Sequence, residues 1–126
     1  MTTSTPAWFE IPTTDLDRAR HFWGAVTQTE LKSEQMGPMK MAIFPHAHQQ
    51  SSGALVEMQG YEPAMAGSIV YLEVDDLQAA LARASDAGGE TLLPVTALPN
   101  GDGFFAQLRD SEGNRVGLFA KRVDAT

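Results

Sequence analysis

The chain has 126 residues, the size of a single domain with its own hydrophobic core. Sixteen Asp and Glu outnumber nine Lys and Arg, so the net charge of −7 disfavours nucleic acid and anionic membranes and suits neutral or cationic ligands. Without cysteine or an apolar run near the roughly 20 residues of a membrane span, we expect a cytoplasmic protein with no disulfide, thiolate chemistry or membrane partner.

The first half of the sequence predicts a strand, a helix and a β-hairpin, in that order. After a tail over 1–6, the segment AWFEIP (7–12) is a short strand closed by proline. The segment TTDLDRARHFWGAV (13–26) is a helix, because its apolar residues recur at helical spacing. A turn and strand over 37–45 and a returning strand over 54–58 form a hairpin around the polar loop HAHQQSSG.

The start of the first helix carries its own signals. Thr14 is expected to cap the helix, with Asp17 three residues later in a capping-box arrangement. His21 lies off the apolar face of the helix, so we expect it to be exposed to solvent.

The second half of the sequence repeats the order of the first. After a connection over 59–67, SIVYLEVDDLQAALARASDAGG is again a strand, an acidic cap and a helix that ends at two glycines. Asp76 takes the place of Asp15, at an offset of 61 residues. Three strand-like segments follow, ETLLPVTAL, GFFAQLRD and NRVGLFA, before a tail over 121–126. This internal repetition is stronger evidence for a fold than any single motif.

The last predicted strand contains a glycine in its middle. In DSEGNRVGLF, a polar turn with Gly113 and Asn114 leads into the strand, and Gly117 follows three residues later. A glycine inside a strand has no side chain to pack, so it usually marks a bulge or a close approach by another group.

Three segments, in the same order along the chain, resemble the vicinal oxygen chelate superfamily, which includes glyoxalase I, the extradiol dioxygenases and the fosfomycin and bleomycin resistance proteins. WFEIPTTDLDRARHFW is similar to the family's opening strand and helix, and VYLEVDDLQAALARASDAGGE to the strand and helix of its second module. FFAQLRDSEGNRVGLF is similar to its closing turn and last strand. The last strand also resembles that of small bacterial glyoxalase-like proteins.

The resemblance implies an α+β fold for one glyoxalase-like domain over 7–120. Two tandem βαβββ modules, over 7–60 and 68–120, are expected to form a cupped eight-stranded sheet around a ligand cavity. The family commonly forms homodimers, so a homodimer is expected. Because both modules lie on one chain, the cavity could also close within a single subunit.

The resemblance also implies where a metal ion would be bound, and those positions can be checked in turn. The family's ligand in the first strand of each module corresponds to Trp8 and Ile69, and its ligand in the last strand to Gly117; none of these can coordinate a metal. In the fourth strand only Glu57 offers a carboxylate, and a single carboxylate does not hold zinc or magnesium tightly. We therefore expect no metal and no other cofactor.

Two histidines leave an alternative open. His46 and His48 form a His-x-His pair that could bind adventitious metal, but the surrounding Gln and Ser favour a polar hairpin tip. Whether Glu57 or either histidine binds any metal stays open at this point.

The alternation of side chains along the strands predicts which residues face the cavity. The implied ligand positions place one set of alternate residues there, whereas Phe44 is more simply a core residue. The expected ligand-binding residues are Trp8, Tyr71, Gln107, Gly117 and Phe119. At Gly117 the missing side chain would leave room for a substrate.

Glu10 shares the predicted cavity face with Trp8, and we expect it to lie opposite Tyr71, which occupies the corresponding position in the second module. A carboxylate between aromatic rings in a cleft is suited to proton transfer, so Glu10 is the candidate catalytic residue, as a general base or as an anchor for a cation. The alternative is a solvated or ion-paired carboxylate at the end of a strand, where it could meet Arg115.

Three functions agree with these residues. The first is a binding protein with a metal-free aromatic cavity for a small molecule. The second is a metal-free enzyme, such as an isomerase, that uses Glu10 for proton abstraction. The third is a metal-dependent lyase or dioxygenase with unconventional ligands, Glu57 among them. The fold alone does not decide between them.

Overall fold

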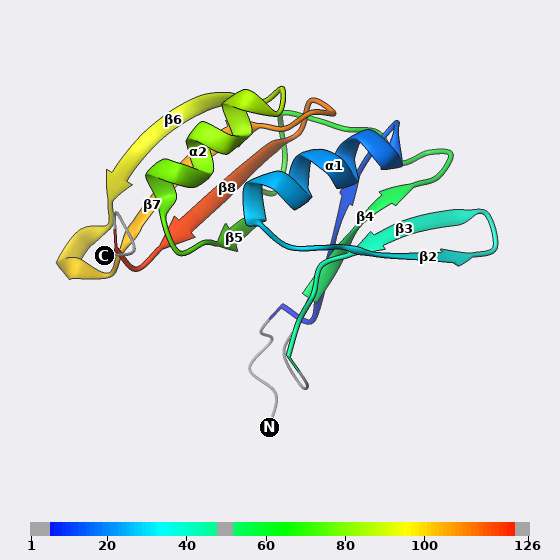
Figure 1. Cartoon of the computed structure of the whole chain (residues 1–126), viewed down its shortest axis with the longest axis horizontal. Coiled ribbons are helices and arrows are strands. Elements are labelled where there is room, and N and C mark those ends of the chain that lie inside the picture. Colours follow the sequence, from blue (N-terminus) through cyan, green and yellow to red (C-terminus); the bar gives the residue numbers. More distant parts are fainter. Residues whose placement is uncertain (1–5, 48–51, 123–126) are drawn as a thin grey trace.

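The computed structural model describes residues 6–47 and 52–122, which fold into two modules of the same order (Figure 1). Module 1 consists of β1 (Trp8–Pro12), α1 (Leu16–Thr27), β2 (Lys32–Met36), β3 (Met39–Ile43) and β4 (Ser52–Glu57). Module 2 consists of β5 (Tyr71–Glu73), α2 (Leu77–Asp86), β6 (Glu90–Ala97), a 3₁₀ turn (Pro99–Gly101), β7 (Phe104–Arg109) and β8 (Arg115–Ala120). The fold is therefore α+β with two βαβββ modules, as the sequence predicts.

Each module has one four-stranded mixed sheet of the same topology. The strand orders are β1-β4-β3-β2 and β5-β8-β7-β6, and the first strand of each sheet pairs in parallel with the last strand of its module. The remaining neighbours are antiparallel. Both helices lie on the same side of the sheets, so the other face of each sheet is open (Figure 1).

The two helices begin in the same way, at positions 61 residues apart. Asp15 Oδ1 accepts a hydrogen bond from Arg18 N, and Asp76 Oδ1 accepts one from Ala79 N, each at 3.0 Å. The predicted cap of α1 was therefore wrong by one residue, because Asp15 is the cap and Thr14 instead binds a carboxylate of module 2. An aspartate at this position satisfies free backbone N–H groups and complements the positive end of the helix.

The core lies between the helices and the sheets. Trp23 and Phe22 of α1 are fully buried with their rings edge to face at 5.1 Å, and Phe44 packs on Trp23. From module 2, Leu108 and Leu118 are fully buried in the same cluster. One apolar core therefore joins the two modules. In the part of the chain that the structure describes, no helix has the length and apolar character needed to cross a membrane.

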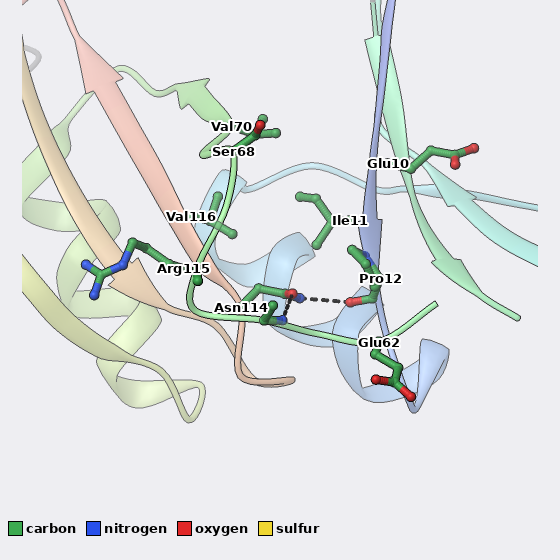
Figure 2. Close-up of a pocket in the computed structure, with 11 residues that line it drawn as sticks. Glu10, Ile11, Pro12, Glu62, Ser68, Val70, Asn114, Arg115 and Val116 are labelled. Carbon is green, nitrogen blue, oxygen red and sulfur yellow. Dashed lines mark hydrogen bonds between the residues drawn. The ribbon is translucent and has the colours of Figure 1, made fainter. Parts of the chain in front are cut away.

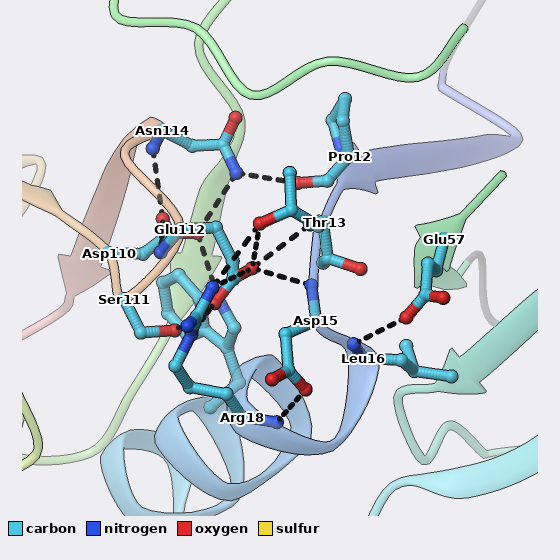
Figure 3. A network of polar contacts seen from close by, with 12 residues as sticks. Pro12, Thr13, Asp15, Leu16, Arg18, Glu57, Asp110, Ser111, Glu112 and Asn114 are labelled. Atoms are coloured by element: carbon cyan, nitrogen blue, oxygen red, sulfur yellow. Dashed lines mark hydrogen bonds and ion pairs between the residues drawn. The ribbon is translucent and has the colours of Figure 1, made fainter. Parts of the chain in front are cut away.

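The turn between β7 and β8 binds module 2 to module 1 through polar contacts (Figure 3). Asp110, fully buried, accepts a hydrogen bond from Trp23 Nε1 at 3.2 Å, and Asn114 Nδ2 donates to the Pro12 carbonyl at 2.8 Å. Glu112 accepts hydrogen bonds from Thr14 N, Asp15 N and the Arg18 guanidinium. The DSEGN motif thus has a structural role at the junction of the modules.

Candidate ligand-binding site

The open face of module 2 carries most of the residues that the sequence predicts for ligand binding. Tyr71 of β5 lies opposite Gly117 of β8, which in turn lies opposite Gln107 of β7. Phe119 lies opposite Phe105. Directly opposed residues project from the same face of a sheet. On the other face of β8, Val116 and Leu118 are buried in the core.

Gly117 makes room for the side chain of Tyr71, not for a substrate. A Cβ atom added at Gly117 would stand 2.2 Å from Tyr71 Cδ2 and 2.3 Å from Cε2, far inside van der Waals contact. The ring of Tyr71 therefore occupies the space over β8 that a side chain at position 117 would need. The prediction that this space is left for a substrate was wrong, although the predicted close approach is real.

The hydroxyl of Tyr71 reaches across β8 to Gln107 on β7, and Gln107 is in turn bonded to Arg115 at the start of β8. Gln107 Nε2 donates to the Tyr71 oxygen at 2.7 Å, and Arg115 NH1 donates to Gln107 Oε1 at 2.9 Å. The Arg115 side chain also donates through Nε to the Met65 carbonyl at 3.2 Å. These contacts hold Tyr71, Gln107 and Arg115 in one arrangement on the open face.

Beside this chain of hydrogen bonds, aromatic side chains line a pocket of about 500 Å³. The rings of Tyr71 and Phe105 stand edge to face, with centroids 6.0 Å apart. The pocket is lined by Tyr71, Glu73, Leu98, Phe105 and Phe119. The sequence prediction included Tyr71 and Phe119 but missed Phe105. Phe105 and Gln107 are two residues apart on one strand and therefore share a face, which was the available signal.

Trp8 and Glu10 lie on module 1, in a different environment. Glu10 is exposed and accepts hydrogen bonds from Trp8 Nε1 at 3.3 Å and from the Tyr61 hydroxyl at 3.1 Å. The hydrogen bond to Glu10 raises the pKa of Tyr61 above its usual value. The expected neighbour of Glu10 was Tyr71, but the tyrosine that bonds to Glu10 comes from the connection between the modules.

Glu10 lines a smaller pocket of about 160 Å³, between β1, the connection and the start of β8 (Figure 2). Arg115 also lines this pocket, but its side chain points away from Glu10 (Figure 2). The alternative that paired Glu10 with Arg115 was therefore wrong, since Arg115 instead binds Gln107 and Met65, whereas the solvated carboxylate of that alternative agrees with the exposed Glu10.

The residues at the implied metal-ligand positions do not fit a metal ion. The side chains at positions 8, 69 and 117 (Trp8, Ile69 and Gly117) have no atom that coordinates a metal ion. Among the described residues, no group of three or more His, Asp or Glu side chains is placed to hold a metal. Glu57 instead accepts a hydrogen bond from Leu16 N at 2.8 Å, at the start of α1, and pairs with Lys40 at 3.9 Å.

In the part of the chain that the structure describes, the histidines belong to no group of side chains that could hold a metal ion. His46 Nδ1 lies 3.1 Å from the Ala47 carbonyl oxygen, and His48 lies outside the described residues. His21 is exposed on α1, as predicted. Phe44 is buried in the core, also as predicted.

A family model described as Glyoxalase/Bleomycin resistance protein/Dioxygenase superfamily matches residues 5–118. The chain therefore belongs to this superfamily. A search of curated proteins found no match to the chain.

Solved structures show the same fold at low sequence identity. An antibiotic binding protein from Streptomyces sp. CB03234, TnmS3, is 23% identical with a TM-score of 0.69, over 95% of this chain and 98% of that one. A glyoxylase/bleomycin resistance protein/dioxygenase domain from Frankia sp. EAN1pec is 18% identical with a TM-score of 0.68, over 94% and 98% of the two chains.

Glyoxalase I from Zea mays is 17% identical with a TM-score of 0.64, and 91% of this chain is covered. The chain spans only 45% of the length of that enzyme chain. At these identities the structures establish a common fold and leave the activity to be argued from the site.

Proposed function

We propose that the chain binds a small, flat organic molecule in the aromatic pocket on the open face of module 2. The observation that carries this proposal is the pocket itself, a half-open hollow of about 500 Å³ that three aromatic rings and Leu98 line. Ligand sites in proteins commonly measure about 300–1,000 Å³ and have apolar walls with a few placed polar groups. Here the lining residues that carry polar groups are Tyr71 and Glu73.

The donor set supports binding of an organic molecule without a resident metal. Trp8, Ile69 and Gly117 cannot coordinate an ion, and Glu57 is engaged by the helix start and Lys40. The similarity in fold to an antibiotic binding protein from Streptomyces agrees with a binding role. Both oxygens of Glu10 accept hydrogen bonds from neighbouring side chains, and no contact in the site favours proton transfer by Glu10 over ligand binding.

A thermal-shift screen of planar aromatic metabolites and antibiotics tests the proposal. A ligand at 100 times its Kd stabilises the folded state by about 2.7 kcal/mol, which raises the Tm of a domain of this size by on the order of 10 °C. The Phe105→Leu variant, with part of the pocket wall removed, should lose most of this shift.

Glu10→Gln is the matched control, because Glu10 lies outside the aromatic pocket. It should keep the full shift for every compound that binds. Loss of binding in Glu10→Gln with full binding in Phe105→Leu would contradict the proposed location. Unchanged affinity with lost turnover of a compound would instead support the enzymatic alternative.

We also propose that the chain forms a homodimer through the open face of module 1. Trp8 and Met36 are 46% and 63% exposed there, and the strand register places Met39, Met41 and Ile43 on the same face. A second copy would cover these apolar side chains. Apolar side chains that are exposed together on one face of a sheet are typical of interaction sites.

A further inference from the structure

Three polar side chains form a chain of hydrogen bonds that begins at a cation and ends at the aromatic pocket. The guanidinium of Arg115 donates to Gln107 Oε1 at 2.9 Å, and Gln107 Nε2 donates to the Tyr71 oxygen at 2.7 Å. Tyr71 is also a wall of the pocket. The positive charge of Arg115 is thus connected to the pocket by two hydrogen bonds.

Chemistry fixes the direction of both hydrogen bonds. The two ends of a glutamine amide have nearly the same shape, so its orientation must be inferred from its partners. The guanidinium of Arg115 has only donors, so the oxygen of Gln107 must face Arg115 and the nitrogen must face Tyr71. The Tyr71 oxygen therefore accepts from Gln107, and the hydroxyl hydrogen of Tyr71 is left to bond another group.

The position of the Tyr71 hydroxyl is fixed as well as its direction. The ring edge lies against Gly117, and a Cβ atom there would stand 2.2 Å from Tyr71 Cδ2. Arg115 is held from its other side by the Met65 carbonyl. Hydrogen bonds in a chain polarise one another, and a cation at the start of the chain strengthens the donor at its end.

We infer that Tyr71 donates this hydrogen to an acceptor oxygen of the ligand. The site then selects flat aromatic molecules that carry a carbonyl or similar oxygen over hydrocarbons of the same shape. This inference rests on the proposed function and adds the chemical class of the ligand. Tyr71 acts as a specificity-determining residue, and Gln107 acts through it as a positioning residue.

Two probes of matched shape test the inference, namely 2-acetylnaphthalene and 2-ethylnaphthalene, which differ in a carbonyl in place of a methylene group. Their Kd values are measured by NMR titration for the wild type and for each variant. One hydrogen bond contributes about 0.5–1.5 kcal/mol. Tyr71→Phe should therefore weaken the ketone about three- to tenfold and change the affinity for the hydrocarbon less than twofold.

Gln107→Glu is a second, independent variant that keeps the Tyr71 hydroxyl. A carboxylate at position 107 accepts from both Arg115 and Tyr71, so the hydroxyl hydrogen turns inward and is lost to the ligand. We expect the same selective loss of affinity for the ketone. Tyr61→Phe removes a hydroxyl that bonds to Glu10 outside the pocket, and it should leave the affinity ratio of the two probes unchanged.

The outcomes separate this inference from the proposed function. If both probes bind the wild type but Tyr71→Phe and Gln107→Glu weaken them equally, the donor role is refuted while the pocket stands. If neither probe saturates the wild type, the aromatic binding site itself is refuted, and the inference falls with it. A selective loss in both variants, with no change in Tyr61→Phe, supports the inference.

Discussion

At position 117 the lack of a side chain determines how the open face of module 2 is built. The ring of Tyr71 lies against the bare backbone of Gly117, and its hydroxyl reaches Gln107 on the strand beyond. Any larger residue at position 117 would compete with that ring for the same space. The glycine therefore acts on the site through its neighbour.

Gly117→Ala should lower the free energy of unfolding by about 1–2 kcal/mol, because the new methyl group forces the Tyr71 ring off the sheet. In a Tyr71→Ala background the same substitution should be neutral or slightly stabilising, since alanine is less flexible than glycine in a strand. Urea unfolding of the four proteins in this double-mutant cycle measures the difference. An equal loss in both backgrounds would show that the ring is not what Gly117 accommodates.

Residues at the site were predicted unevenly, for a physical reason. Strand alternation together with the ligand positions that the resemblance implies identified Tyr71, Gln107 and Phe119 as site residues, since alternation within a strand depends only on local geometry. It gave no distance between strands, so it did not show that the Tyr71 ring covers Gly117. The hydrogen-bond partner of Glu10 was missed for a related reason. Tyr61 lies in a connection without periodicity, so no pattern in the sequence shows that it contacts Glu10.

Among the elements, the start of α1 is joined to the β7–β8 turn by the carboxylate of Glu112 (Figure 3). The side chain of Glu112 is fully buried, which by itself opposes ionisation, but hydrogen bonds from Arg18, Asp15 N and Thr14 outweigh this effect. They lower the pKa of Glu112 from 4.5 to about 2. The ionised carboxylate of module 2 thus stabilises the start of a helix in module 1.

A depressed pKa in the folded state means that this stabilisation is present above the unfolded pKa and is lost as the pH falls from about 4.5 towards 2. Glu112→Gln should lower the free energy of unfolding at pH 7 by roughly 2 kcal/mol, a value reduced for the solvent exposure of Arg18. Its difference from the wild type should shrink through that pH range. Urea unfolding from pH 7 to pH 2.5 measures both effects.

The exposed Glu62 provides the control for this experiment. Glu62→Gln should differ little from the wild type at any pH. A Glu112→Gln difference that stays constant between pH 5 and pH 2.5 would contradict the assignment of this pH dependence to Glu112.

Element boundaries show where sequence patterns were insufficient. The strand β2, KSEQM, is exposed along its whole length. Because neither of its faces is buried, its sequence shows no alternation of apolar and polar residues, and it was not predicted as a strand. Its place is set by pairing with β3. The cap of α1 was assigned to Thr14 because a capping box fits there, but Glu112, 98 residues away, binds Thr14 and leaves Asp15 to cap the helix.

In the whole molecule, the two modules were predictable because the chain repeats itself. The offset of 61 residues places Asp15 and Asp76 at equivalent helix caps in the structure. The distribution of the candidate site was not predictable from that repeat. The structure places Glu10 in a different pocket from Tyr71 and Phe119. A local sequence pattern does not show which residues from distant parts of the chain line the same pocket.

The proposed homodimer predicts a solution mass of twice the chain's 13.6 kDa in light scattering at tens of micromolar protein. Met41→Glu places a charge on the open face of module 1 and should shift the protein to the monomer. Met65→Glu makes the same change at an exposed methionine of the connection and should leave the dimer intact. A wild-type mass of 13.6 kDa under these conditions would exclude the proposed interface.

The most direct measurement of the central claim is an amide NMR titration of the wild type with 2-acetylnaphthalene. If the aromatic pocket is the binding site, the saturable shift changes should concentrate on β5, β7 and β8, with the amide of Gly117 among the largest. Saturable changes confined to residues around Glu10, or to module 1, would contradict it.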